Sequence, residues 1–181
     1  IAAAAARWVR PGSAVGISAG PASRALARAL AHVADLTVVT NSVRVADILG
    51  SAGRRDRHVV LTGGARVDAD VLVGPVAVQS LRGLHLDRVF LGVHGMAEGP
   101  GFTIGDLSES ETDRALIDAG RELLILAEHT RFDTVGLSTV AALAEAHVLV
   151  TDDGLGERAR RVLSAHVGEL VLAPGPIGAD G

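Results

Sequence analysis

Seven short apolar segments, separated by stretches of helical composition, constrain the fold of this 181-residue chain more than any other feature of its sequence. Each segment is rich in Val, Ile and Leu and shows little alternation of polar with apolar residues. Strands that are buried on both faces, as in a parallel sheet, have this composition. The sequence therefore predicts seven buried strands, over residues 13–18, 36–40, 58–62, 87–93, 122–127, 147–151 and 169–173.

The stretches between these segments predict helices that connect one strand to the next. Such alternation is typical of an α/β fold with a doubly wound, mostly parallel sheet and right-handed crossovers. Residues 1–12 predict a further helix that ends at Gly12, with Arg7 and Arg10 in its last turn. Since no linker or repeat divides the chain, we expect a single domain over residues 1–181. The connecting helices are expected over residues 22–33, 42–51, 74–84, 108–120, 136–144 and 155–165.

Two residue types are missing from the sequence, and their absence excludes several kinds of chemistry. The chain has no cysteine, which excludes disulfides, thiolate catalysis and Cys-based zinc sites and favours a cytoplasmic location. It also has no lysine, so a lysine Schiff base and a Walker A phosphate loop are both impossible. The seven histidines form no i, i+4 pair, so we expect no metal site and no cofactor. No apolar run is long enough to span a membrane.

The charge distribution makes the chain a poor binder of nucleic acid by itself. Its net charge is −4, and the strongest basic cluster lies in residues 53–58. One Trp, three Phe and no Tyr offer little surface on which bases could stack.

Small polar residues follow the predicted strands, at the edge of the sheet where ligands bind in folds of this kind. Glycines, hydroxyls, an amide and one arginine gather there, which favours a site for a small, oxygen-rich anion. A dinucleotide is disfavoured, because the first strand is not followed by Gly-x-Gly-x-x-Gly and the second does not end in an acidic residue. The candidate binding residues are Ser18, Gly20, Ser23, Thr40, Asn41, Gly63, Gly64, Gly92, His94, Glu111 and Arg131.

The loop over residues 18–23 is the candidate that raises the sharpest question. Gly20 would let the backbone approach an anion at the N-terminus of the first connecting helix, and Ser23 could add a hydroxyl donor. Arg131, just beyond a buried strand, suits bidentate binding of a phosphate. Ser18 and Ser23 could equally be ordinary turn and capping residues.

Other candidates also have a structural alternative. Asn41 could be a helix cap or a turn former, and Gly63 with Gly64 could simply make a turn. Glu111 could close a capping box with Ser108, pair with Arg114 one turn on, or point into the cleft beside Arg131. The sequence leaves these alternatives open.

Taken in order, the motifs resemble those of a known family of sensor domains. Residues 18–22 stand at an Asp-x-Gly-x-Thr motif, and residues 37–42 (TVVTNS) at a Val-x-Thr-Asn-Ser motif. A Gly-Gly, spacer, Gly pattern, an Asp-x-x-Phe-x-Gly stretch, an Ala-Asp-x-x-Lys-Phe stretch and a final Thr-Asp follow. Their counterparts here are residues 60–74, 87–96, 126–132 and 148–154, and residues 101–118 match a Glu-rich stretch between them. Over residues 1–173 the chain resembles the C-terminal sensor domain of DeoR-family transcriptional repressors.

The resemblance implies both a fold and a function. It implies the fold group of ribose-5-phosphate isomerase, glucosamine-6-phosphate deaminase and CoA transferases. It implies a domain that binds a phosphorylated sugar or a related metabolite and thereby controls DNA binding by an N-terminal helix-turn-helix domain. That DNA-binding domain is missing from this chain, and a repressor of palindromic sites is expected to be at least a dimer. Ser18 replaces the family's first-strand Asp, and Arg131 replaces its Lys.

The alternative is an isomerase- or deaminase-like enzyme on the same fold. Such enzymes need a general base and a cation beside the developing enediolate. The chain has no lysine, and the loop over residues 92–101 offers only His94 and Glu98. We therefore expect a sensor domain rather than an enzyme.

Overall fold

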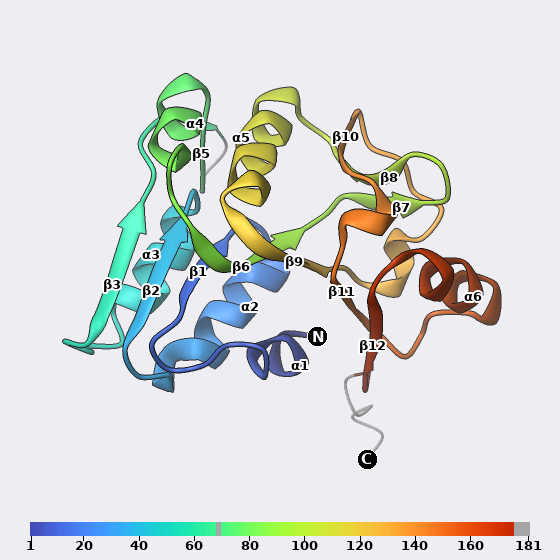
Figure 1. Cartoon of the computed structure of the whole chain (residues 1–181), viewed down its shortest axis with the longest axis horizontal. Helices are drawn as coiled ribbons and strands as arrows, with labels where there is room; N and C mark the ends of the chain where they lie inside the picture. Colours follow the sequence, from blue (N-terminus) through green and yellow to red (C-terminus); the bar gives the residue numbers. More distant parts are fainter. Residues whose placement is uncertain (68–69, 176–181) are drawn as a thin grey trace, which may run out of the picture.

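The computed structural model, which describes residues 1–67 and 70–175, is built around one parallel sheet (Figure 1). Its seven strands pair in the order β12-β11-β9-β6-β1-β2-β3, and every neighbouring pair is parallel. These are the seven strands predicted from the apolar segments, so the predicted fold class is confirmed. Their bounds are β1 Ala14–Ile17, β2 Leu36–Thr40, β3 Arg57–Leu61, β6 Leu86–Gly92, β9 Gly120–Leu126, β11 Val148–Asp152 and β12 Glu169–Ala173.

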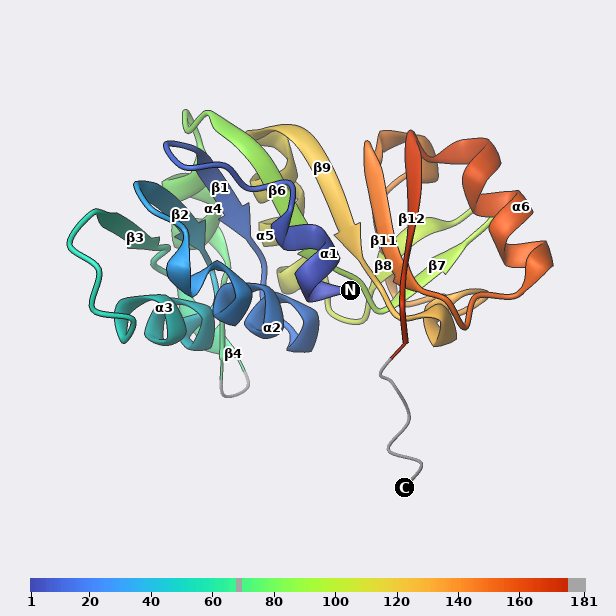
Figure 2. The same cartoon turned by 90° about the horizontal axis from the view of Figure 1, so that it is seen from below.

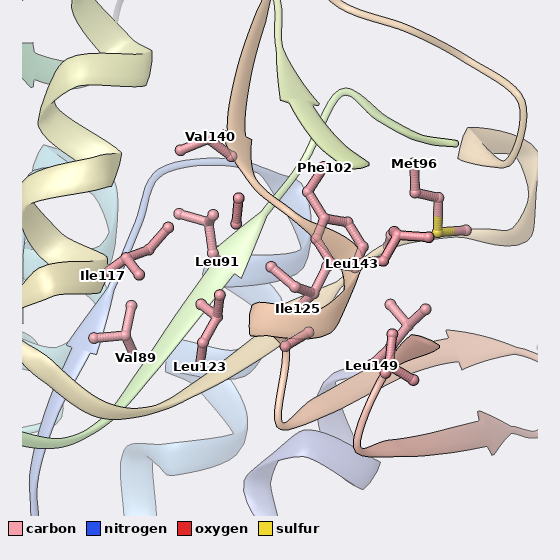
Figure 3. Packing of buried hydrophobic residues seen from close by; sticks show 14 of the residues in the cluster. Val89, Leu91, Met96, Phe102, Ile117, Leu123, Ile125, Val140, Leu143 and Leu149 are labelled. Carbon is pink, nitrogen blue, oxygen red and sulfur yellow. The ribbon is translucent and has the colours of Figure 1, made fainter. Parts of the chain in front are cut away.

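Helices cover both faces of this sheet, which explains why its strands are apolar throughout. In β6, Phe90 belongs to the core under α1, α2 and α3, whereas Val89 and Leu91 belong to the core under α4, α5 and α6. Figure 2 shows the first three helices together on one side of the sheet, and Figure 3 shows part of the opposite core. The helices are α1 Ala2–Ala6, α2 Pro21–Ala29, α3 Val43–Gly50, α4 Pro75–Leu81, α5 Leu107–Asp118 and α6 Glu157–His166. None of the helices in the described part of the chain is long and apolar enough to cross a membrane.

Two predicted helices differ from the structure. The first helix, α1, ends at Ala6, and Arg7 is its C-cap rather than part of its last turn. Pro11 accounts for the early end, because a proline disfavours helical geometry at the preceding residue and cannot donate to the helix.

The predicted helix over residues 136–144 is wrong. The segment forms strand β10 (Ser138–Ala141) and the short 3-10 helix η3 (Leu143–Glu145). β10 pairs with β8 (Gly101–Ile104), which also pairs with β7 (Gly95–Ala97). The apolar residues that suggested a helix instead fill the core from a small antiparallel sheet. A second addition is the hairpin of β4 (Ala65–Val67) and β5 (Val71–Val73).

One buried arginine ties the edge strand β3 to the helices beside it. The Arg57 guanidinium donates to four backbone carbonyls, those of Leu49 at 3.2 Å, Leu30 and Ala31 at 2.9 Å, and Val33 at 3.1 Å. These carbonyls lie at the ends of α3 and of the 3-10 helix η1 (Leu30–His32), where helices leave acceptors without partners. Burial, and then the charge of Arg54, lower the pKa of Arg57. Arg57 therefore has a structural role, although it belongs to the strongest basic cluster of the sequence.

A second buried ionisable group lies on α5. Asp113 is almost fully buried, and its Oδ1 atom has no hydrogen-bond partner in the part of the chain that the structure describes. Burial raises the pKa of this carboxyl well above its usual value, and the charge of Glu109 raises it further. Asp113 is consequently held in its neutral form over a wider pH range than an exposed carboxyl.

We expect Arg57→Met to lower the free energy of unfolding by about 2 kcal/mol, because four carbonyls lose a charged donor. Urea denaturation followed by circular dichroism measures the change. The matched control is Arg55→Met, since Arg55 is exposed. Equal unfolding midpoints for the two variants would contradict the structural role of Arg57.

Asp113→Asn is expected to change how stability depends on pH. A carboxyl whose pKa is raised by folding favours the folded state fully below its unfolded pKa, about 4, and that stability is lost as pH rises through the folded pKa. The wild-type protein should therefore lose stability relative to Asp113→Asn as pH increases from about 4. Denaturation series of both proteins, with the exposed Glu169→Gln as control, test this; a difference independent of pH would show that Asp113 ionises as an exposed carboxyl does.

Candidate functional site

A cavity of about 420 Å³ lies at the carboxyl ends of three neighbouring strands, β1, β6 and β9. Four of the predicted site residues line it: Gly20, Gly92, His94 and Arg131. They come from the loop before α2, the end of β6 and the segment after β9. Because the sheet is parallel, these segments are distant in sequence but meet at one edge.

The N-terminus of α2 faces this cavity without a cap from a side chain. Gly20 is the N-cap residue, with φ of 123° and no side-chain capping bond, and Pro21 occupies the first helical turn. Gly20, Pro21 and Ala22 all line the cavity. A Cβ atom added to Gly20 would meet no atom within 4 Å, so the space in front of it is open. The free N–H groups and the dipole of a helix start favour a negatively charged group at such a place.

Ser18 and Ser23 lie beneath the cavity rather than on its wall, and both are fully buried. The Ser18 hydroxyl accepts a hydrogen bond from the Gly92 N–H at 3.1 Å and donates to the Ala19 carbonyl at 3.3 Å. The Ser23 hydroxyl donates to the same carbonyl at 3.3 Å. The two serines therefore fix the loop before α2 against the end of β6. Neither caps α2.

Arg131 contributes a cationic side chain to the wall of the cavity. It ends the 3-10 helix η2 (His129–Arg131), and its guanidinium makes only a long contact, 3.5 Å, to the His94 carbonyl. Within residues 1–67 and 70–175 it forms no ion pair, so most of its donors remain available to a ligand.

Asp152, at the end of β11, holds the helix η2 that carries Arg131. Its carboxylate accepts from the His129 backbone N–H at 2.9 Å and contacts the His129 ring nitrogen Nδ1 at 2.5 Å. Burial opposes ionisation of Asp152, but these hydrogen bonds and one from the Gly154 N–H together lower its pKa. The Thr-Asp motif of the sequence thus positions the segment that ends in Arg131.

The cavity also contains three carboxylates that the sequence analysis missed: Asp106, Glu109 and Glu128. Asp106 is the N-cap of α5 and accepts from the Glu109 N–H at 2.9 Å. Glu128 directly precedes η2 and was visible only as part of a motif. Asp106 and Glu109 reach the site because the hairpin of β7 and β8 returns the chain to the sheet edge, and no periodicity in the sequence reveals that return.

The predicted capping box of α5 is wrong. Because Asp106 caps the helix, Ser108 lies inside it, and Arg114 pairs with Asp118 and Glu145 instead of Glu111. Glu111 is exposed and lines other hollows along α5, so the structure does not bring it to Arg131.

The remaining candidates lie at the same sheet edge, at the ends of β2 and β3. The Thr40 hydroxyl donates to the Ile17 carbonyl at 2.6 Å. Gly64 has φ of 127°, and a Cβ there would lie 2.5 Å from the Val73 carbonyl oxygen; a Cβ on Gly63 would lie 2.8 Å from Val76. Both glycines therefore permit close packing of the β4–β5 hairpin and of α4.

Asn41 differs from these residues because its side chain is unsatisfied. It is 1% exposed, and neither polar atom of its amide has a hydrogen-bond partner in the described part of the chain. No group of three or more His, Asp or Glu residues among the described residues is placed to hold a metal ion.

Comparison with known folds identifies the architecture of the sheet. Ribose-5-phosphate isomerase A from Neisseria gonorrhoeae superposes with a TM-score of 0.53 at 14% identity, over 76% of this chain and 51% of that chain. The enzyme from Methanocaldococcus jannaschii gives 0.51 at 13% identity, over 72% and 51%. The decarboxylase AibA/AibB gives 0.53 at 14% identity, over 97% and 88%. At these identities the similarity shows a shared fold.

Sequence comparison finds transcriptional regulators. The uncharacterized regulator YgbI of Escherichia coli is 32% identical over 170 residues, which cover 93% of this chain and 66% of the relative. The repressor GlcR of Bacillus subtilis is 29% identical over 82% of this chain and 56% of its own length. The glycerol-3-phosphate regulon repressor of E. coli is 26% identical over 92% and 66%. The chain thus spans about two thirds or less of these relatives. The family model of the DeoR C-terminal sensor domain matches residues 1–153, and the chain belongs to this family.

Proposed function

We propose that this domain senses a phosphorylated sugar or a related small anionic metabolite in the cavity at the ends of β1, β6 and β9. The observation that carries the proposal is that the uncapped N-terminus of α2 and the unpaired guanidinium of Arg131 line the same cavity. One supplies backbone N–H groups and a positive dipole end, and the other supplies a bidentate cationic donor. Together they suit a phosphate group.

The rest of the cavity suits the hydroxyl groups of a sugar. Asp106, Glu109 and Glu128 supply carboxylate oxygens, which accept hydrogen bonds from hydroxyls. Asn41, with its unsatisfied amide at the neighbouring strand end, remains a candidate partner for a further polar group. Ser18 and Ser23 act by holding the loop in place. The name of the glycerol-3-phosphate regulon repressor supports this class of ligand.

The proposed output is control of DNA binding by an N-terminal helix-turn-helix domain, in a cytoplasmic homo-oligomer. A physical route runs through α2, because Leu26, Ala27 and Leu30 pack in one core with Ala5 and Val9 at the start of the chain. An anion at the N-terminus of α2 would fix this helix, and α1 rests on it. Relatives longer than this chain, such as YgbI, are helix-turn-helix regulators and support the proposal.

Arg131→Ala should weaken binding of the sugar phosphate by about thirtyfold, since a lost charge-assisted contact costs about 2 kcal/mol. Gly20→Val should weaken it at least as much, because its side chain would enter the cavity and strain the backbone at positive φ. Calorimetry against a panel of sugar phosphates measures both effects, with the exposed Arg121→Ala as control. If the wild type binds one compound and both variants bind it equally well, the loop is only a turn.

The enzyme alternative makes a different prediction. The cavity holds His94 and three carboxylates, and the fold is shared with ribose-5-phosphate isomerases. We expect no isomerisation of sugar phosphates above the uncatalysed rate, because the chain lacks a lysine for the developing enediolate. A coupled assay with a bound sugar phosphate tests this. Turnover that His94→Ala abolishes would favour the enzyme.

A further inference from the structure

A second hollow, of about 580 Å³, lies between α2 and α3 on the solvent side of the helix layer. Arg24 and Arg28 from α2 and Arg44 from α3 line it, together with Asp47 and Asp70. It is distinct from the cavity of the proposed function. The first turn of α2 lines that cavity through Gly20 and the following two residues, whereas later turns of the same helix line this hollow.

The three guanidinium groups have donors to spare. Arg24 reaches the Asp70 carboxylate only at 3.4 Å, which is long for a hydrogen bond. In the described part of the chain, the side chains of Arg28 and Arg44 form no hydrogen bond and no ion pair. Arginines that bind nothing in the protein and border one hollow are suited to an external anion.

The surrounding acidic residues do not neutralise this cluster. One oxygen of Asp70 is already occupied by the Ser42 hydroxyl at 2.9 Å and the Arg44 backbone N–H at 2.6 Å, at the start of α3. Arg24 and Arg28 are also four residues apart on one helix, where like charges destabilise the helix unless something offsets them. An anion between α2 and α3 would remove that repulsion.

The shape of the hollow indicates the size of the anion. A concave site of several hundred cubic ångströms fits a small molecule. Duplex DNA is a poorer fit, because Asp47 and Asp70 border the hollow and would repel the neighbouring phosphates of a duplex. We propose that this hollow is a second anion site, which takes inorganic phosphate or the phosphate group of a small metabolite independently of the first cavity.

The test is an NMR titration of the ¹⁵N-labelled chain with inorganic phosphate at constant ionic strength, with chloride as the reference anion. Saturable shifts of the Arg24, Arg28 and Arg44 signals are expected. The double variant Arg28→Ala/Arg44→Ala should weaken this binding by about tenfold or more. The exposed pair Arg121→Ala/Arg161→Ala, which changes the net charge equally, should leave it unchanged.

Two further arms separate the alternatives. Arg131→Ala should retain the phosphate shifts of this hollow, so failure of the first cavity would leave the second site intact. A glycerol phosphate titration shows whether a metabolite binds more tightly than the free ion. Shifts that do not saturate, or that the Arg28→Gln variant shows unchanged along with the double variant, would overturn the proposal. Shifts caused by duplex DNA but not by phosphate would overturn it too.

Discussion

Parallel pairing sends the carboxyl ends of all seven strands of the main sheet to one edge, and the segments that follow them begin there. Helix α2 starts at that edge with N–H groups that the chain does not cap, because its N-cap is a glycine. Arg131 reaches the same edge from β9 through a short turn that Asp152 of the neighbouring strand β11 holds in place. The positive character of the cavity therefore follows from strand direction, together with one uncapped helix and one arginine.

The sheet was predictable because its strands are buried on both faces. Consecutive residues of β6 enter two different cores, so the segment shows an unbroken apolar run that sequence analysis recognises. The residues at the strand ends were predictable for the same reason, since parallel strands bring their ends together. Gly20, Gly92, His94 and Arg131 all line the cavity as a consequence.

The errors arose where partners distant in sequence decide the local structure. Residues 138–141 form a strand because β8 lies beside them, although their apolar residues also suit a helix face. Glu111 and Ser108 match a capping box, yet Asp106 caps α5 one residue before the helix begins. Asp106 and Glu109 enter the cavity through the β7–β8 hairpin, and this excursion leaves no periodic signal in the sequence.

The central claim is that the N-terminus of α2 and Arg131 bind one anionic group between them. A crystal structure of the chain with a bound sugar phosphate tests it most directly. The account predicts phosphate oxygens within hydrogen-bond distance of the backbone N–H groups of Ala22 and Ser23 and of the Arg131 guanidinium. A phosphate bound elsewhere, at the ends of β2 and β3 or only among Arg24, Arg28 and Arg44, would contradict it.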